Sequence, residues 1–333
     1  MPAALAFETD QYNLPPTPLA DIGDEVSEYT EENIRNAIDK INSEIADQQA
    51  CSDRVNQVSS KCSLEASVQM RLVYLRSDEA VAREVYNQLG YGIIAFARAA
   101  TWMNSHNFRS QPARYKTTYR RSIFVFIPTN YFTISPTVNM YGKSFGTDKI
   151  AHFFQQGYTY YRIFGRAVAK GSSTDEAVKK AVGWGRMTER TYYGALISGV
   201  FSNADLYANY AGLRFYKGLT KPVTIGGLTR PATVILKNGI WVFNEAVNIR
   251  QTLLRPFISD HLNEALNPSV FVPGLRSSIR RIVRKQSCPQ WRALYPDRTK
   301  SDFELTTNSL SLWNDEDYGF KKSNKSVTIG NTC

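Results

Sequence analysis

The sequence lacks several features that would assign it to a common class of protein. Its 333 residues contain no run near the ~20 apolar residues that a membrane-spanning helix needs, and the most apolar stretch, residues 92–103, is interrupted by Arg98. Only four cysteines and three histidines occur, without a Cys-x-x-Cys and without a His at ligand spacing from a Cys. A dinucleotide fingerprint and a complete P-loop are also missing. Integral membrane proteins, zinc fingers, thioredoxin-like redox proteins and nucleotide-dependent enzymes are therefore disfavoured.

What is present is the composition of a folded protein with an uneven distribution of charge. Hydrophobic residues make up 43% of the chain and aromatic residues 12%, far more than a disordered chain carries. The net charge is +10, yet residues 1–50 hold eleven acidic residues against Arg35 and Lys40 alone. The rest of the chain is strongly basic, and such a field favours anionic partners such as an anionic envelope lipid, a glycan or nucleic acid.

The N-terminus and the cysteines both indicate export. Ala4-Leu5-Ala6 has the A-x-A form of a signal-peptidase site, although the charged and apolar segments of a signal peptide do not precede it. Cys51 and Cys62 flank a short polar stretch and are expected to pair, which leaves Cys288 and Cys333 for a second disulfide near the C-terminus. Because an even number of cysteines fits an oxidising compartment, we expect a periplasmic or extracellular protein.

The spacing of apolar residues predicts a mainly α fold, a compact helical bundle with a small β-hairpin insertion at about residues 222–243. Isoleucines at positions 34, 38, 41 and 45 follow one face of a helix, whereas Asn238-Gly239 between β-branched runs is typical of a hairpin turn. We expect five parts: an export-signal remnant and Pro-rich lead (1–24), an N-terminal helical cap (25–110), an irregular or short-strand connector (111–145), a helical core with the hairpin and a basic helix (146–285), and a C-terminal tail (286–333).

Polar residues interrupt the apolar helices expected in the central block. Asp148 and His152 stand four residues apart and share a helix face, and Asp205 and Asn209 repeat this spacing in a second apolar segment. Glu189 is expected to begin a helix of small residues. Because a lone charge among apolar side chains is costly, we expect His152, Glu189, Asp205 and Asn209 to lie within hydrogen-bonding reach of one another.

This ordered set resembles the pattern of a known family. Asp148-Lys149-x-x-His152-Phe153, then Glu189, then Phe201-Ser202-x-x-Asp205-x-x-x-Asn209-x-x-Gly212 is similar to the DKxxHF … E … SxxDxxxNxxG pattern of VanZ-like proteins and YfiM-like predicted periplasmic lipoproteins. The resemblance covers roughly residues 146–216. It implies a helical, envelope-associated core in which these polar residues meet, with no settled reaction. The chain lacks the transmembrane character of VanZ-like members and has long terminal extensions, which argues against a membrane-embedded role.

One chemistry open to this cluster is hydrolysis. His152 would be the general base, oriented by Asp148 or Asp205, while Lys149 or Arg186 would hold an anionic group of the substrate. The residues expected to act in catalysis are His152, Asp148, Glu189 and Asp205. The residues expected to bind substrate or ligand are Lys149, Arg186, Asn209, Ser202, His261 and Glu264. No G-x-S-x-G elbow surrounds Ser202, so the chemistry of classical serine hydrolases is disfavoured.

Two further readings involve no hydrolysis. In the first, His152, Glu189 and Asp205, with His261 as a further candidate, supply nitrogen and oxygen ligands to Zn, Mn or Fe; no other cofactor is expected. In the second, the cluster is a structural network in which Asp148 caps its own helix and His152 donates to Asp205. The spacing of the residues does not choose between a divalent metal site and a network without a metal.

A basic amphipathic helix is expected near the end of the core. Arg276, Arg280 and Arg284 recur every four residues, and such a face can rest on anionic lipid headgroups or remain solvated. Nucleic acid is not expected, because no helix-turn-helix, RRM or OB signature is present. The sequence thus predicts an exported, envelope-associated helical protein that binds an anionic lipid-linked or glycan ligand. The alternative is a phosphoester or acyl ester hydrolase that uses the His152 cluster.

Overall fold

The computed structural model describes residues 8–53, 65–92, 97–125, 134–191, 194–195 and 198–333, and these form a mainly α protein. The α-helices are α1 (Gly23–Asp53), α2 (Glu65–Leu75), α3 (Asp78–Val85), α4 (Arg98–Ser105), α5 (Thr147–Ala151), α6 (Gly157–Ala169), α7 (Thr174–Arg190), α8 (Asn203–Gly218), α9 (Pro273–Ile282), α10 (Cys288–Leu294), α11 (Lys300–Ser309) and α12 (Ile329–Thr332). The π-helical turns are η1 (Tyr86–Gly90), η4 (His152–Gln156), η5 (Ile249–Leu253) and η8 (Val283–Ser287), and the 3-10 turns are η2 (Tyr119–Arg121), η6 (Arg255–Phe257) and η7 (Asp260–Leu262).

The strands form small antiparallel pairs rather than one extended sheet. The pairs are β1 (Thr137–Met140) with β2 (Lys143–Gly146), β3 (Val200–Ser202) with β8 (Ser269–Phe271), β4 (Val223–Ile225) with β5 (Leu228–Arg230), and β6 (Val234–Lys237) with β7 (Ile240–Phe243). The expected insertion at 222–243 is therefore two consecutive hairpins. Both residues of each turn, Gly226-Gly227 and Asn238-Gly239, have positive φ, as tight hairpin turns require.

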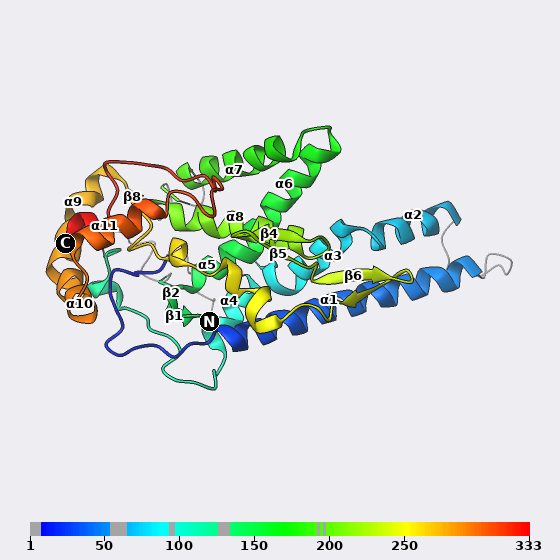
Figure 1. The fold of residues 1–333 in the computed structure, drawn as a ribbon, viewed down its shortest axis with the longest axis horizontal. Coiled ribbons are helices and arrows are strands. Elements are labelled where there is room, and N and C mark those ends of the chain that lie inside the picture. The colour runs from blue at the N-terminus through cyan, green and yellow to red at the C-terminus, as the bar shows by residue number, and fades with distance from the viewer. Residues whose placement is uncertain (1–7, 54–64, 93–96, 126–133, 192–193, 196–197) are drawn as a thin grey trace.

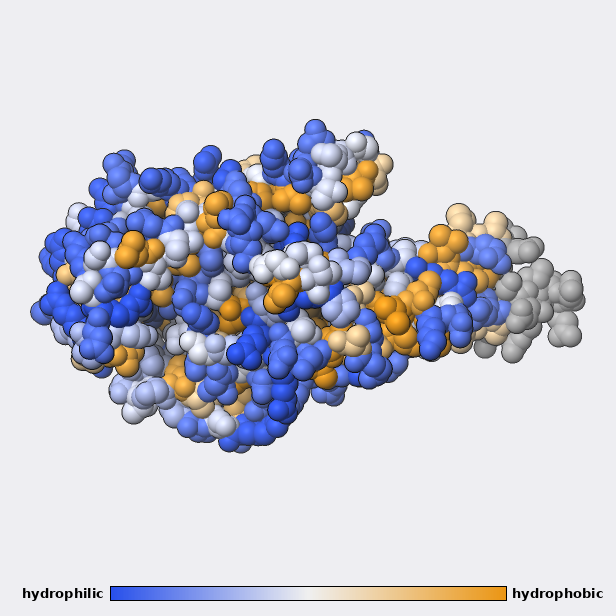
Figure 2. Space-filling model, viewed as in Figure 1, coloured by the Kyte–Doolittle hydropathy of each residue, from blue (hydrophilic) through white to orange (hydrophobic). Residues whose placement is uncertain are grey.

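Helices α1 and α2 project from the rest of the molecule as an arm (Figure 1), and β7 of the β6–β7 hairpin packs against α1, where Asn42 is hydrogen-bonded to the backbone of Trp241. The four isoleucines of α1 are buried, so the predicted helix face is confirmed. Acidic side chains of α1 pair with Arg71, Arg109 and Arg250 from other segments. Because this arm extends away from the other helices, the predicted compact bundle is not confirmed. Figure 2 shows apolar side chains along the arm. Within the described residues, no helix combines the length and apolar character needed to cross a bilayer.

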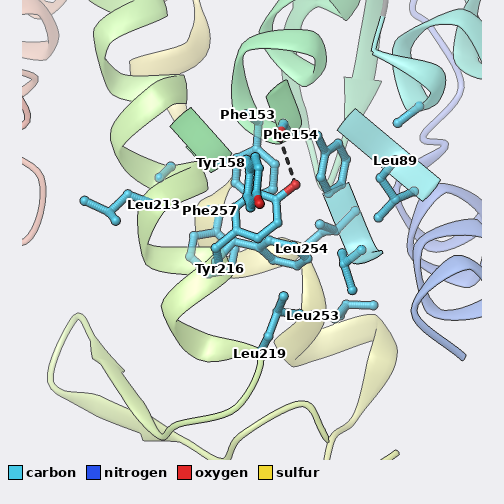
Figure 3. Close-up of a cluster of buried hydrophobic side chains, with 14 of the residues drawn as sticks. Leu89, Phe153, Phe154, Tyr158, Leu213, Tyr216, Leu219, Leu253, Leu254 and Phe257 are labelled. Carbon is cyan, nitrogen blue, oxygen red and sulfur yellow. Dashed lines mark hydrogen bonds between the residues drawn. The ribbon is translucent and has the colours of Figure 1, made fainter. Parts of the chain in front are cut away.

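The core is built where α6, α8 and η4 cross. Phe153 and Phe154 from η4 pack with Tyr158 of α6 and with Tyr216 of α8, whose hydroxyl donates to the Phe154 carbonyl at 2.8 Å (Figure 3). Two glycines, Gly157 of α6 and Gly212 of α8, lie against each other at the crossing. This close approach brings Asn209 of α8 within hydrogen-bonding distance of His152 of η4.

Three local predictions differ from the structure. Glu189 does not begin a helix but lies in the last turn of α7. The apolar spacing of residues 249–266 also predicts a helix, but the structure has a series of short turns there, because Pro256 lacks the amide hydrogen that a long helix would need. The C-terminal tail carries helices α10, α11 and α12, which bury Trp291 and Phe303 in a second apolar cluster.

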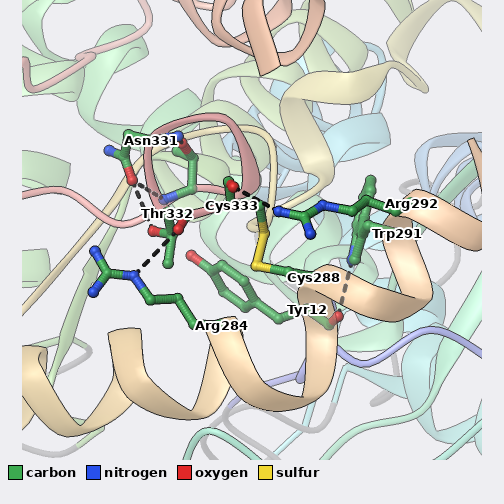
Figure 4. Close-up of a disulfide and its surroundings, with 9 residues drawn as sticks. Tyr12, Arg284, Cys288, Trp291, Arg292, Asn331, Thr332 and Cys333 are labelled. Carbon is green, nitrogen blue, oxygen red and sulfur yellow. Dashed lines mark hydrogen bonds between the residues drawn. A yellow bond between two sulfur atoms is a disulfide. The ribbon is translucent and has the colours of Figure 1, made fainter. Parts of the chain in front are cut away.

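The C-terminus is held by the Cys288–Cys333 disulfide, which confirms that predicted pair (Figure 4). Cys62 lies outside the described residues, as does Ala4-Leu5-Ala6, so the Cys51–Cys62 pairing and the export-signal remnant stay predictions. Beside the disulfide, the indole of Trp291 donates to the Tyr12 carbonyl at 2.9 Å, and the Tyr12 hydroxyl donates to the Val327 carbonyl at 2.8 Å. The C-terminal region therefore fixes an N-terminal segment, residues 8–13, that is buried throughout.

Candidate functional site

Lys149 is the centre of a buried polar cluster. Its side chain is 0% exposed, and its Nζ donates to Asp148 Oδ2 at 2.7 Å, to Asp205 Oδ1 at 2.5 Å and to Glu264 Oε1 at 2.5 Å. Although burial alone lowers the pKa of a lysine, these three carboxylates raise the pKa of Lys149 well above its usual range. Lys149 is therefore a charged group whose hydrogen bonds all go to buried carboxylates. That it holds an anionic group of a substrate stays a prediction, and its complete burial argues against it.

Two further carboxyl groups, Glu8 and Glu189, complete the cluster. Both are buried, and burial followed by the field of neighbouring carboxylates raises the pKa of each well above its usual range. Neither oxygen of Glu8 has a hydrogen-bond partner among the described residues. The next residue is well held, since the Thr9 hydroxyl donates to Asp148 Oδ1 at 2.6 Å. The N-terminal segment thus forms one wall of the cluster.

Ser202 joins the cluster at the junction of β3 and α8. Its Oγ accepts the backbone amide of Asp205 at 3.1 Å as the N-cap of α8 and donates to Glu264 Oε1 at 2.9 Å. Its backbone amide donates to Glu189 Oε2 at 3.3 Å. Ser202 therefore starts the helix and at the same time orients two carboxyl groups, those of Glu189 and Glu264.

His152 begins the π-helical turn η4, where the helix from α5 to α6 carries one wider turn. Such turns occur frequently at functional sites. The ring Nδ1 lies 3.1 Å from Asn209 Oδ1, and Nε2 lies 3.6 Å from Asp205 Oδ2. The side chain is 12% exposed, while Asp205 and Asn209 are buried. His152 is therefore the member of this group that reaches towards the surface.

The expected convergence is thus observed, with a different bonding pattern. One nitrogen of His152 and one oxygen each from Glu189 and Asp205 all lie within 4.8 Å of one another. Asp148 does not cap its helix, because Gly146 occupies the N-cap position and the Asp148 carboxylate is taken by Thr9 and Lys149. Instead of donating to Asp205, His152 is bonded through Nδ1 to Asn209.

Two predicted residues lie elsewhere. His261 stacks on Tyr207, and its two ring nitrogens are bonded to the Ser259 hydroxyl and the Leu312 carbonyl, so it is not a member of the cluster. Arg186 donates to the Gly319 carbonyl at 2.9 Å and pairs with an Asp at the protein surface. Both side chains are occupied by contacts with the C-terminal region, which the sequence pattern does not reveal.

The basic helix forms as predicted over α9 and η8. Two of the three arginines predicted to form its basic face are used inside the molecule: Arg280 donates to the Ser326 carbonyl at 2.9 Å and Arg284 to the Thr332 carbonyl at 3.3 Å. These bonds, one of which is drawn in Figure 4, hold the C-terminal segment against the helix. Of the three, Arg276 alone makes no such contact with the tail within the described part of the chain, so the helix presents less free charge than its sequence indicates.

Sequence reasoning missed the part that the N-terminal segment plays. Thr9 bonds to Asp148, which lies more than a hundred residues further along the chain. Glu8 lies close to Asp148 and Glu264, and the side chain of Gln11 accepts a hydrogen bond from the backbone amide of Glu264. A Pro-rich lead without periodicity gives no sign of such burial. The one sign of burial in the sequence is an aromatic residue, Tyr12, among polar neighbours in a stretch that otherwise resembles a loop.

No family model matches this chain, and neither a curated protein nor a solved structure matches it. The resemblance to VanZ-like and YfiM-like proteins therefore rests on the sequence pattern and stays a prediction. The chemistry of the cluster has to be argued from its geometry. Its centre is sealed, and the edge at His152 is the place where a small ion or water can approach.

Proposed function

We propose that this protein is an extracytoplasmic binding protein for a phosphate-bearing amphiphile, and that the ligand lies along α6, α7 and α8. The support is a pair of surface hollows of about 350 and 320 Å³ that have Thr174 and Lys217 in common as lining residues. We call this pair the α7–α8 groove. In this groove, cationic and apolar side chains line the same concave surface.

Charge is the observation that carries the proposal. Three of the four acids that line the groove are neutralised by neighbours, since Glu316 pairs with Arg214, Asp317 with Arg186 and Asp78 with Lys221. The fourth is Asp175. Lys179 and Lys217 make no ion pair within the described part of the chain. Burial lowers the pKa of Lys217, and the neighbouring cations Arg214 and Lys221 lower it further, against the opposing effect of the acids Glu316 and Asp175. An anionic group in the groove would relieve this repulsion.

The apolar lining argues for an amphiphile rather than a free anion. Lys217 Nζ lies 4.4 Å from the centre of the Phe164 ring, and Tyr161 and Val168 line the same hollow. These side chains offer a surface for an acyl or prenyl chain, whereas Lys179 and Lys217 would take the phosphate. A lipid headgroup, a lipid-linked glycan phosphate and free phosphate share this anion chemistry. The Cys288–Cys333 disulfide is compatible with the oxidising compartment in which such envelope lipids occur.

The first prediction tests the groove by titration calorimetry with dihexanoyl phosphatidic acid. We expect Lys179→Ala/Lys217→Ala to weaken binding by about tenfold or more, because each lysine would lose a charge-assisted hydrogen bond. Lys170→Ala, an exposed lysine at the end of α6, is the matched control and should bind as the wild type does. Equal binding by all three proteins, or none by the wild type, would refute the proposal. Inorganic phosphate and the zwitterionic choline lipid distinguish a free anion site from a lipid site.

A hydrolase is the second candidate, because the partly exposed His152 retains Asp205 and Asn209 beside its two ring nitrogens. The second prediction is that the wild-type protein turns over neither p-nitrophenyl phosphate nor p-nitrophenyl acetate above the His152→Ala background, since Lys149 and three carboxylates are sealed from substrate. Turnover that is present in the wild type and lost in His152→Ala, with the melting temperature unchanged, would establish the enzyme instead.

A further inference from the structure

The edge of the polar cluster at His152 holds polar atoms that lack partners. Asp205 Oδ2 is buried and accepts no hydrogen bond within the described residues, although the other oxygen of the same carboxylate is bonded to Lys149. It faces His152 Nε2 at 3.6 Å, beyond hydrogen-bonding distance. We propose that His152, Glu189 and Asp205 bind one divalent transition-metal ion, a site separate from the α7–α8 groove.

The orientation of His152 supports this site. The Asn209 amide oxygen can only accept, so Nδ1 carries the ring hydrogen and donates it, which leaves a lone pair on Nε2 of the neutral ring. That nitrogen and the unpartnered oxygen of Asp205 lie 3.6 Å apart. Two acceptors face each other favourably when a cation lies between them. A metal-binding histidine is usually held in this way, by a hydrogen bond from its other nitrogen.

The spacing and type of the donors fit a transition metal. Ligands at about 2.1 Å from a tetrahedral ion lie about 3.4 Å apart, and the three donor atoms here lie within 4.8 Å of one another, so the widest pair would close by up to about 1.4 Å as the ion binds. One imidazole and two carboxylates suit Zn²⁺, Mn²⁺ or Fe²⁺, whereas Ca²⁺ and Mg²⁺ prefer oxygen alone.

The charge of the cluster supports a cation as well. Five buried carboxyl groups surround one lysine and one histidine, and unpaired buried carboxylates are costly. A second set of acids, Glu8, Asp148 and Glu264, also lies close together. Lys149 is already bonded to two of these three, and its ammonium would repel an ion placed there. The ion therefore belongs on the His152 side of Asp205, away from that ammonium.

Each proposed ligand is also held from behind. Lys149 fixes the far oxygen of Asp205, the Ser202 amide fixes Glu189 Oε2, and Asn209 fixes the ring of His152. Such supporting contacts orient ligands before the ion arrives. An ion can reach the site from solvent beside His152, whose side chain is 12% exposed, whereas Glu189 and Asp205 are buried.

The third prediction is that the full-length protein, treated with EDTA and dialysed, binds one Zn²⁺ or Mn²⁺ per chain by calorimetry and melts at a higher temperature with the ion present. Co²⁺ should give visible absorption bands, because nitrogen and oxygen ligands split its d levels. We expect His152→Ala and Asp205→Asn to weaken binding by about 100-fold or more. His106→Ala removes a surface histidine paired with Glu25 and is the matched control.

A further variant tests the metal site without changing any of the three ligands. Asn209→Ala leaves all three ligands in place and should weaken binding by about 10- to 100-fold through the ring orientation alone. The site is refuted if the EDTA-treated wild type binds no ion, or if His152→Ala binds it as tightly as His106→Ala does. Because Lys179→Ala/Lys217→Ala should bind metal normally, the groove and the metal site can fail independently.

Discussion

Lys149→Met is expected to destabilise the protein by at least about 3–5 kcal/mol, the usual cost of removing one partner from a buried ion pair. Methionine keeps the length and most of the volume of the side chain, so the change removes the charge while leaving little cavity. Three buried carboxylates would lose their ammonium at once, because Asp148, Asp205 and Glu264 all accept from the same Nζ. Urea unfolding at neutral pH, followed by far-UV circular dichroism, measures the loss.

Lys143→Met is the matched control for this experiment. Lys143 also pairs with a carboxylate, Asp260, but both side chains are more than a third exposed, so its loss should cost about 1 kcal/mol or less. Lys149→Met/Glu264→Gln should recover part of the lost stability, because one carboxylate fewer remains uncompensated. A cost for Lys149→Met equal to that of Lys143→Met, or no recovery in the double variant, would contradict the assigned role of Lys149.

The sequence allowed the polar residues of the central block to be chosen, because isolated charge on an apolar helix is costly. His152, Glu189, Asp205 and Asn209 were expected to meet and do so. The role of Lys149 could not be predicted in the same way. Its position beside Asp148 indicates a charged face, whereas its burial depends on Glu264, which lies 115 residues further along the chain.

The sequence predicted local structure better than it predicted contacts between distant segments. The turn at Asn238-Gly239 and the isoleucine face of α1 depend on neighbours in sequence, and both are observed. The burial of Glu8 depends on the C-terminal region, through Tyr12 and its contacts with Trp291 and Val327. No periodicity within residues 8–13 encodes a contact with partners nearly three hundred residues away, so this wall of the site emerges only from the tertiary structure.

The helix crossing at Gly212 determines whether the candidate site assembles. A Cβ added at Gly212 would lie 2.0 Å from the Phe153 carbonyl oxygen and 2.7 Å from the Gly157 Cα, and backbone atoms cannot yield cheaply. Helix α8 would have to move away from η4, which carries His152. Because Asn209 lies one turn before Gly212 on the same helix, its contact with His152 would lengthen. This explains in physical terms why an Asn-x-x-Gly spacing accompanies the histidine.

We therefore expect Gly212→Ala to lower stability by about 3 kcal/mol or more, at the upper end of overpacking costs, and to weaken Zn²⁺ binding. Gly165→Ala on α6 is the matched control, since a Cβ there meets nothing within 4 Å. Both changes gain the same helix propensity, so Gly165→Ala should stabilise by about 0.5–1 kcal/mol and leave metal binding unchanged. Thermal melts with and without Zn²⁺ measure both effects. If Gly212→Ala melted like Gly165→Ala, the close crossing of α6 and α8 would not be what positions Asn209 against His152.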